Sequence, residues 1–118
     1  MSSGDKKPKL SVFFYRTKAG LEPVRVWLRE LPDDDRRRIG SDLHRVQMDW
    51  PVGMPLCRPL GNGLWELRSS LPSGRISRLI FFIEDREIYV VHGLIKKTQK
   101  TPPADLALAM RRLKETRE

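Results

Sequence analysis

Residues 88–103 read IYVVHGLIKKTQKTPP, and the prediction of the fold starts from them. Residues 88–95 are mostly apolar or aromatic, which is typical of a buried strand. Three lysines follow between residues 96 and 100. Thr101 is expected to be the N-cap of a helix and Pro102 its first residue. The stretch therefore predicts a dense cationic turn between a buried strand and a helix, and such a turn suits phosphate.

Two more strands are predicted immediately before this stretch. Residues 75–83 carry apolar side chains on both faces, which indicates a central strand. Residues 64–68 alternate in polarity, as a strand with one buried face does. Turn-forming residues at 71–74 and charged residues at 84–87 separate the strands. Because these connections are short, the strands are expected to pair antiparallel.

The N-terminal half predicts a strand followed by a helical hairpin. Residues 10–15 are rich in β-branched and aromatic side chains, and helical stripes follow over residues 21–31 and 33–50, with Pro32 between them. Residues 51–63 contain several prolines and glycines and are interpreted as a loop, which either contacts a partner or merely crosses from helix to sheet. The order β-α-α-β-β-β-α predicts an α+β fold, a small antiparallel sheet with an N-terminal helical hairpin and a C-terminal helix.

The composition indicates a small basic protein. The 118 residues fit a polar N-terminal tail over residues 1–9 and one domain over residues 10–118. The tail lacks the apolar core of a signal peptide, and no apolar run approaches the roughly 20 residues that cross a bilayer. The lone Cys57 forms no internal disulfide, which fits the cytoplasm. The net charge of +8 favours nucleic acid, an acidic protein or an anionic membrane as partner, with solubility alone as the other interpretation.

The sequence contains no pattern that predicts a metal or a cofactor. His44 and His92 have no cysteine or carboxylate at ligand spacing. Residues 33–35 are all aspartates, but adjacent helical positions diverge, so we interpret them as favourable charges at a helix start. No glycine-rich phosphate loop or nucleophile elbow is present. We therefore expect neither a metal nor an organic cofactor.

Cationic side chains are the remaining candidates for a site. Arg68 and Arg78 lie on neighbouring predicted strands, and the lysines follow the last strand. Arg78 interrupts an apolar strand, where an unpaired guanidinium is costly. Either a carboxylate such as Glu66 pairs with it, or it faces a groove that binds anions, and the two are compatible. The lysine run itself is either a nucleic-acid contact or a solvated turn.

The histidine of the last strand also has two interpretations. A lone histidine on a strand is more often structural. Yet the predicted face of His92 includes Val90, Leu94 and Lys96, which places it beneath the cationic turn. At that place, a group that titrates near neutral pH suits proton transfer.

Three segments of the chain are similar to a known family: WELR at residues 65–68, RLIFF at 78–82 and HGLIKKTQKTP at 92–102. Over about residues 10–115, the chain resembles the phage-related HigB-like branch of the RelE/ParE toxin superfamily. The resemblance implies a RelE-like fold, which is a small twisted antiparallel sheet with an N-terminal helical hairpin. This fold agrees with the element order expected from the residues.

The resemblance also implies an activity and partners. RelE/HigB-like proteins are toxins of type II toxin–antitoxin systems, which act in the cytoplasm and cut mRNA on the ribosome without a metal. The ribose 2′-OH attacks the adjacent phosphate and leaves a 2′,3′-cyclic phosphate and a 5′-OH. The implied partners are the ribosome with its mRNA and a HigA-like helix-turn-helix antitoxin, with no membrane. Two alternatives stay open: a gyrase inhibitor of the ParE kind, which the lysine run disfavours, and a degenerate module that binds only RNA or its antitoxin.

Attack within the RNA strand requires a base, an acid and cations around the phosphate. A guanidinium matches two phosphate oxygens, and a lysine crowded by other cations has a lowered pKa and serves as a base. The expected catalytic residues are Arg68, Arg78, Lys97 and His92. The expected RNA-binding residues are Lys96, Lys100, Gln99 and Arg75. The predicted C-terminal helix contains no tyrosine, which disfavours a mechanism based on tyrosine.

Overall fold

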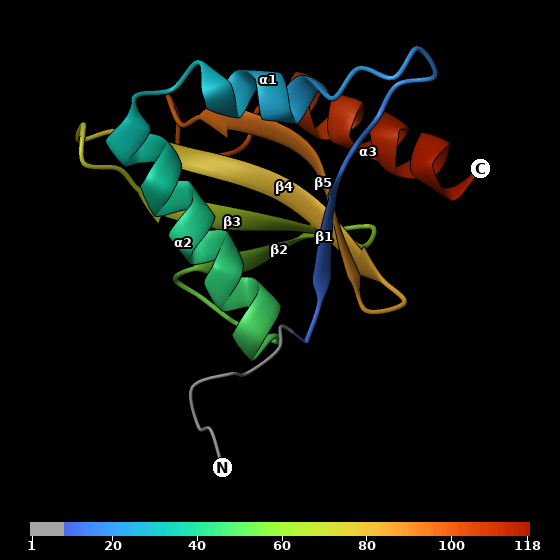
Figure 1. Cartoon of the computed structure of the whole chain (residues 1–118), viewed down its shortest axis with the longest axis horizontal. Coiled ribbons are helices and arrows are strands. Elements are labelled where there is room, and N and C mark those ends of the chain that lie inside the picture. The colour runs from blue at the N-terminus through green and yellow to red at the C-terminus, as the bar shows by residue number, and fades with distance from the viewer. Residues whose placement is uncertain (1–8) are drawn as a thin grey trace.

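The computed structural model describes residues 9–118, and its strands form one sheet with helices on both faces (Figure 1). The strands are β1 Ser11–Phe14, β2 Cys57–Gly61, β3 Leu64–Ser70, β4 Ile76–Glu84 and β5 Glu87–Ile95. The helices are α1 Pro23–Arg29, α2 Asp33–Asp49 and α3 Pro103–Arg117. The sheet has the order β1-β5-β4-β3-β2, with β1 parallel to β5 and the other neighbours antiparallel. The predicted α+β class, with its helical hairpin and C-terminal helix, is confirmed.

The side chains of β4 explain why both faces of the sheet are covered. Leu79 and Phe81 lie in a core with the hairpin of α1 and α2, whereas Ile80 and Phe82 lie in a second core with α3. All four side chains are at most 1% exposed. Burial of each stabilises the fold by roughly 1.5–3 kcal/mol. The prediction that this segment is a central strand is confirmed.

The prediction of a loop over residues 51–63 is wrong in part, because β2 lies inside it. β2 pairs antiparallel with β3 at the edge of the sheet, and the register shifts between Pro59 and Gly61. Proline and glycine are tolerated on an edge strand because one of its sides makes no ladder hydrogen bonds. The observed order is therefore β-α-α-β-β-β-β-α. The first helix is also shorter than predicted, since α1 begins at Pro23 and Leu21 is 64% exposed.

A β-bulge in the hairpin of β4 and β5 sets the face on which His92 lies. Ile80 pairs with His92, but the next residue, Phe81, pairs with Val90. The extra residue on β5 shifts the alternation of faces at that point. Val90 therefore packs in the core beneath the helical hairpin, while His92 shares the opposite face with Ile80. The prediction that Val90 and His92 share a face is wrong.

Of the predicted N-terminal tail, the structure describes only the last residue, Lys9. Residues 1–8 of the predicted tail lie outside the described residues. Lys9, the last residue of that tail, donates its backbone N–H to the carbonyl of Gln47 at 3.0 Å. Within residues 9–118, no helix has the length and the apolar composition needed to cross a membrane.

Candidate functional site

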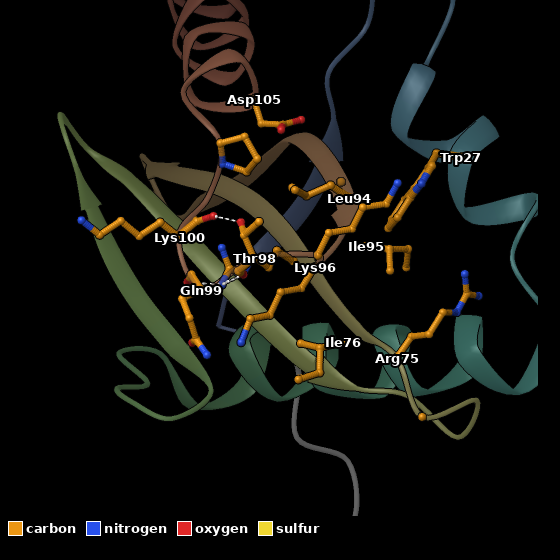
Figure 2. A pocket seen from close by; sticks show the side chains of 15 residues that line it. Trp27, Arg75, Ile76, Leu94, Ile95, Lys96, Thr98, Gln99, Lys100 and Asp105 are labelled. Carbon is orange, nitrogen blue, oxygen red and sulfur yellow. Dashed lines mark hydrogen bonds between the residues drawn. The ribbon is translucent and has the colours of Figure 1, made fainter.

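The segment that follows β5, residues 96–101, is named here the cationic turn, and it closes one side of a groove of about 1100 Å³. The ends of β4 and β5, the first turn of α3 and Trp27 of α1 form the rest of the groove (Figure 2). Six of the predicted site residues line it: Arg75, Arg78, Lys96, Lys97, Gln99 and Lys100. The lining contains one carboxylate, Asp105, and Arg75 and Arg78 pair with carboxylates outside it, so the three lysines carry the excess charge. The groove is therefore complementary to an anion.

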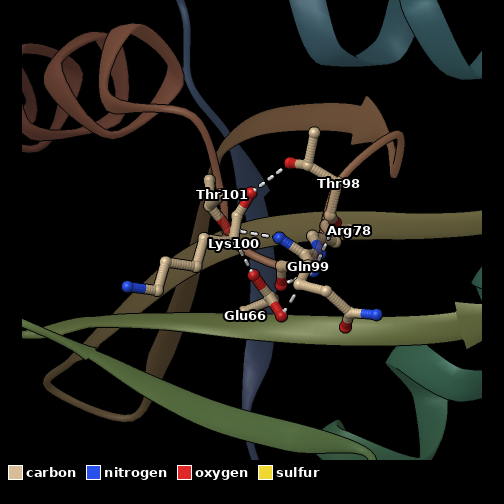
Figure 3. Close-up of polar contacts among 6 residues, drawn as sticks. All are labelled: Glu66, Arg78, Thr98, Gln99, Lys100 and Thr101. Carbon is tan, nitrogen blue, oxygen red and sulfur yellow. Dashed lines mark hydrogen bonds and ion pairs between the residues drawn. The ribbon is translucent and has the colours of Figure 1, made fainter.

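Arg78 lies on β4 directly beneath the cationic turn and is only 2% exposed. Its Nη1 donates to the hydroxyl of Thr101 at 2.8 Å, and its Nη2 donates to the carbonyls of Gln99 at 2.6 Å and Thr98 at 3.3 Å (Figure 3). Its Nε lies 3.6 Å from Oε1 of Glu66, which is equally buried. Of the two interpretations of Arg78, the pair with Glu66 is present, and the guanidinium also reaches the groove. The contacts to carbonyls hold the cationic turn against the sheet.

Thr101 completes this buried network and does not cap α3. Pro102 occupies the N-cap position and α3 begins at Pro103, without a side-chain cap. The hydroxyl of Thr101 donates to Oε2 of Glu66 at 2.7 Å and accepts from Arg78. The prediction that Thr101 caps the helix and Pro102 begins it is wrong, because the hydroxyl is the bridge that satisfies a buried ion pair.

Lys96 is the half-buried lysine of the groove. Its backbone N–H donates to the carbonyl of Ile76 at 2.7 Å, which extends the pairing of β4 and β5 past the end of the strand. Burial lowers the pKa of its ammonium, the nearby charges of Arg68 and Arg78 lower it further, and Glu66 acts in the opposite direction. Lys97 and Lys100, by contrast, are exposed. Crowding by cations thus falls on Lys96, which the sequence analysis placed among the RNA-binding residues.

His92 lies beside the groove and has a carboxylate partner that the sequence analysis missed. Its Nε2 is 2.6 Å from Oδ1 of Asp105, which lines the groove from the first turn of α3. The two side chains are 15% and 27% exposed. The bond orients the imidazole relative to the cationic turn. No local spacing signals this pair, because the turn folds α3 back over β5 to form it.

Arg75 connects the groove to the start of α2. Its Nη2 lies 3.3 Å from Oδ2 of Asp35, a carboxylate that is 1% exposed and also accepts the N–H of Ser73 at 3.1 Å. Burial acts to raise the pKa of the Asp35 carboxyl, but hydrogen bonds from Ser73 and Arg75 outweigh it and hold that pKa below its usual value. Asp35 therefore anchors the β3–β4 turn, a role beyond the favourable helix-start charge expected from the sequence.

An aromatic side chain also lines the groove and was missed. The ring of Trp27 lies against the backbone of Gly93, where an added Cβ would come within 2.5 Å of Cζ3. Only glycine permits this contact between α1 and β5. The lone glycine within an apolar strand was the sequence signal for such a close approach.

Arg68 lies outside the lining of the groove but close to it. It is exposed on β3 and is the direct partner of Arg78 in the register of β3 and β4. Its charge acts on Lys96, so it lies at the rim. Within residues 9–118 there is also no cluster of three or more histidine, cysteine, aspartate or glutamate side chains placed to hold a metal ion.

Comparison with known proteins places this sequence in a family. Residues 26–114 match the sequence profile of a family described as phage derived protein Gp49-like (DUF891). Among curated proteins, none matches the chain in sequence. The matched region begins in α1 and ends in α3, so it contains every residue that lines the groove.

Proposed function

Since the chain belongs to the phage-derived Gp49-like family, a RelE-like toxin family of toxin–antitoxin systems, we propose that it is a type II toxin that cleaves mRNA on the ribosome. The observation that carries the proposal is the groove, whose three lysines include a half-buried one of lowered pKa. Each nucleotide of RNA carries one negative charge, and attack on a phosphate adds further charge in the transition state. Fixed cations stabilise that added charge.

Lys96 is the base of the proposed reaction. Its neutral amine removes the proton of a ribose 2′-OH, the 2′ oxygen bonds to the adjacent phosphorus, and the bond from phosphorus to the 5′ oxygen breaks. The products are a 2′,3′-cyclic phosphate and a 5′-OH, without a metal. The lowered pKa of Lys96 supports this role because it increases the share of neutral amine near pH 7.

The cationic side chains around Lys96 bind the phosphate. Lys97 and Lys100 are exposed on the turn and Arg68 is exposed at the rim, so all three ammonium or guanidinium groups are open to a ligand. Arg78 acts from behind, through the carbonyls that it holds. We assign Gln99 and Arg75, which also line the groove, to contacts with the RNA.

His92 is the acid of the proposed reaction. The 5′ oxygen must gain a proton as it leaves, and a ring N–H of an imidazolium can supply one. Asp105, at 2.6 Å, fixes the orientation of the ring, and its own carboxylate faces the groove. The further partner of the toxin is a HigA-like helix-turn-helix antitoxin, which neutralises it.

A pulse of expression followed by primer extension on cellular mRNA tests the proposal. Wild-type protein should give codon-phased cuts that carry a 5′-OH, and Lys96→Gln should give none at equal protein level. Lys114→Gln, which removes an exposed lysine from α3 far along the chain from the groove, is the matched control and should cut like wild type. Growth arrest with intact transcripts and broken chromosomal DNA would instead identify a gyrase inhibitor and overturn the proposal.

A further inference from the structure

A second cationic hollow, of about 580 Å³, includes Arg68 in its lining and shares no lining residue with the groove. It is bounded by α2, by the segment of residues 52–56 and by the end of β3. Three arginines contribute to its lining, Arg38 and Arg45 from α2 and Arg68 from β3. The lining contains one carboxylate, Asp42. We name this site the α2 hollow.

The charges of the α2 hollow are not balanced internally. Arg38 forms an ion pair with Asp42, with Nε 3.3 Å from Oδ2. Arg45 and Arg68 are exposed and form no ion pair with any residue in the range 9–118. The hollow therefore presents two uncompensated positive charges, which makes it complementary to an anionic ligand with more than one charge.

Arg68 lies between the α2 hollow and the groove in the register of the sheet. It lines the hollow, and its register partner on the next strand is Arg78, which lines the groove. Neighbouring strands are only about 4.8 Å apart, so the two sites lie one strand from each other. The effect of the Arg68 charge on Lys96 agrees with this proximity. The groove and the α2 hollow therefore approach each other at the Arg68–Arg78 pair of β3 and β4.

We propose that an RNA strand bound in the groove continues over Arg68 into the α2 hollow, where Arg38 and Arg45 bind the phosphates of nucleotides beyond the one that is cut. This inference rests on the proposed function, and it extends the RNA contact to a face that was not part of the predicted site. Successive phosphates on one strand require successive cations along one path, and the series Lys96, Arg68, Arg45 provides it.

The floor of the α2 hollow supports the same occupant. Val52, Met54 and Leu56 line it, and Met54 is 72% exposed. An exposed thioether beside guanidinium groups offers an apolar surface on which a base can lie while its phosphate meets a cation. Stacking contacts of this kind do not select for a particular nucleobase. This gives the segment before β2 a role, and favours partner contact over mere crossover for residues 51–63.

The test compares probes of two lengths. The probes are 2′-O-methyl RNA oligonucleotides, which cannot be cleaved because the nucleophilic hydroxyl is blocked. One has about four nucleotides and fills only the groove, and one has about twelve and reaches the hollow. Binding to the full chain is followed by fluorescence anisotropy over a series of salt concentrations.

The double variant Arg38→Ala/Arg45→Ala should weaken binding of the long probe alone. Loss of two phosphate contacts lowers the salt slope by about 1.4, because each contact on a single strand contributes about 0.7. The short probe should bind as it does to wild type. Arg25→Ala/Arg29→Ala is the matched control, since it removes the same charge from the helical hairpin beside a different hollow, and it should leave both probes unaffected.

Two further variants protect the result against misfolding. Arg45→Ala alone keeps the pair of Arg38 with Asp42 and should lower the slope for the long probe by about 0.7. Arg38→Lys/Arg45→Lys should retain most of the slope. The inference is overturned if the hollow variants bind the long probe like wild type, if both probes weaken equally, or if only capture of the antitoxin is lost, which would assign the hollow to an acidic protein. Loss of cleavage in Lys96→Gln is measured separately. Failure of the proposed function can therefore be distinguished from failure of the inference about the α2 hollow.

Discussion

The inner and outer sides of the cationic turn use arginine in opposite ways. Arg78 and Arg68 are direct partners in the register of β3 and β4, yet Arg78 is 2% exposed and Arg68 is exposed. Arg78 donates to two carbonyls of the turn and pairs with Glu66, whereas Arg68 makes no ion pair within residues 9–118. Burial favours a guanidinium with internal partners, and both terminal nitrogens of Arg78 have them, so only the outer arginine is free for a ligand. The same residue type thus fixes the turn on one side and serves the RNA on the other.

The largest expected effect comes from Arg78→Ala. This change leaves Glu66 buried without its partner charge and frees the carbonyls of Thr98 and Gln99, at a cost of about 3–5 kcal/mol in the free energy of unfolding. Urea denaturation followed by circular dichroism measures it. Arg78→Lys retains the charge but not the fork of donors, and should lie between Ala and wild type. An Arg78→Ala protein that is inactive but as stable as wild type would show that Arg78 contacts substrate and is not a clamp.

Lys96→Gln tests whether the half-buried lysine between Arg78 and Arg68 is the base of the reaction. Loss of the base should reduce cleavage by about 10²–10⁴-fold, because proton transfer by a positioned side chain contributes that much. Lys97→Gln, on the exposed side, should reduce it far less. The rate is measured on purified ribosomes with a defined mRNA. Equal losses in the two variants would place Lys96 among the phosphate-binding lysines.

The pH dependence of cleavage also tests the assignment of Lys96 as the base. Burial and the charges of Arg68 and Arg78 lower the pKa of Lys96, so its neutral form grows as pH rises toward that pKa. Cleavage by wild type should therefore include a limb that rises with pH and is set by Lys96. The rising limb should be absent from the residual activity of Lys96→Gln. A rising limb that persists in Lys96→Gln would assign the titrating group to another residue.

Much of the fold follows from local patterns in the sequence. The apolar runs of β4 and β5 and the prolines that end helices are local signals, and the structure contains these elements where they were expected. The order of the elements then limits the pairing of the sheet. β2 was missed because proline and glycine interrupt it, which an edge strand tolerates.

The candidate site is less accessible from the sequence, because its decisive contacts join distant residues. Thr101 contacts Glu66 across 35 positions, and Asp35 contacts Arg75 across 40. Spacing rules act over one or two helical turns and give no information about such pairs. The lysine run was found because it is contiguous, but which lysine is crowded depends on how far β5 extends. The lowered pKa of Lys96 is therefore a consequence of tertiary structure.

Gly93→Ala probes the far wall of the groove, and its expected effect on stability is smaller than that of Arg78→Ala. The added Cβ would lie 2.5 Å from the ring of Trp27, so the ring must shift. Overpacking of this kind costs about 1–3 kcal/mol in the free energy of unfolding. Trp27→Leu/Gly93→Ala removes the clash and should recover part of the loss, which thermal denaturation of the three variants measures. No recovery would mean that the strand itself, and not the ring, requires glycine.

The smallest expected effect on stability belongs to Arg68→Ala, and it separates the two sides of the turn most cleanly. Arg68 is exposed, so its loss should change the free energy of unfolding by no more than about 0.5 kcal/mol. Binding of a long non-cleavable RNA should nevertheless weaken, with a salt slope lower by about 0.7, because one phosphate contact is lost. Arg78→Ala should show the reverse pattern, a large loss of stability with no comparable change in slope among the molecules that remain folded. If Arg68→Ala destabilises the protein as strongly as Arg78→Ala does, both arginines belong to one structural network and the rim is not a ligand site. If instead stability is retained and the slope falls, the charge of Arg68 acts on RNA alone, which is what an arginine without an internal partner is free to do.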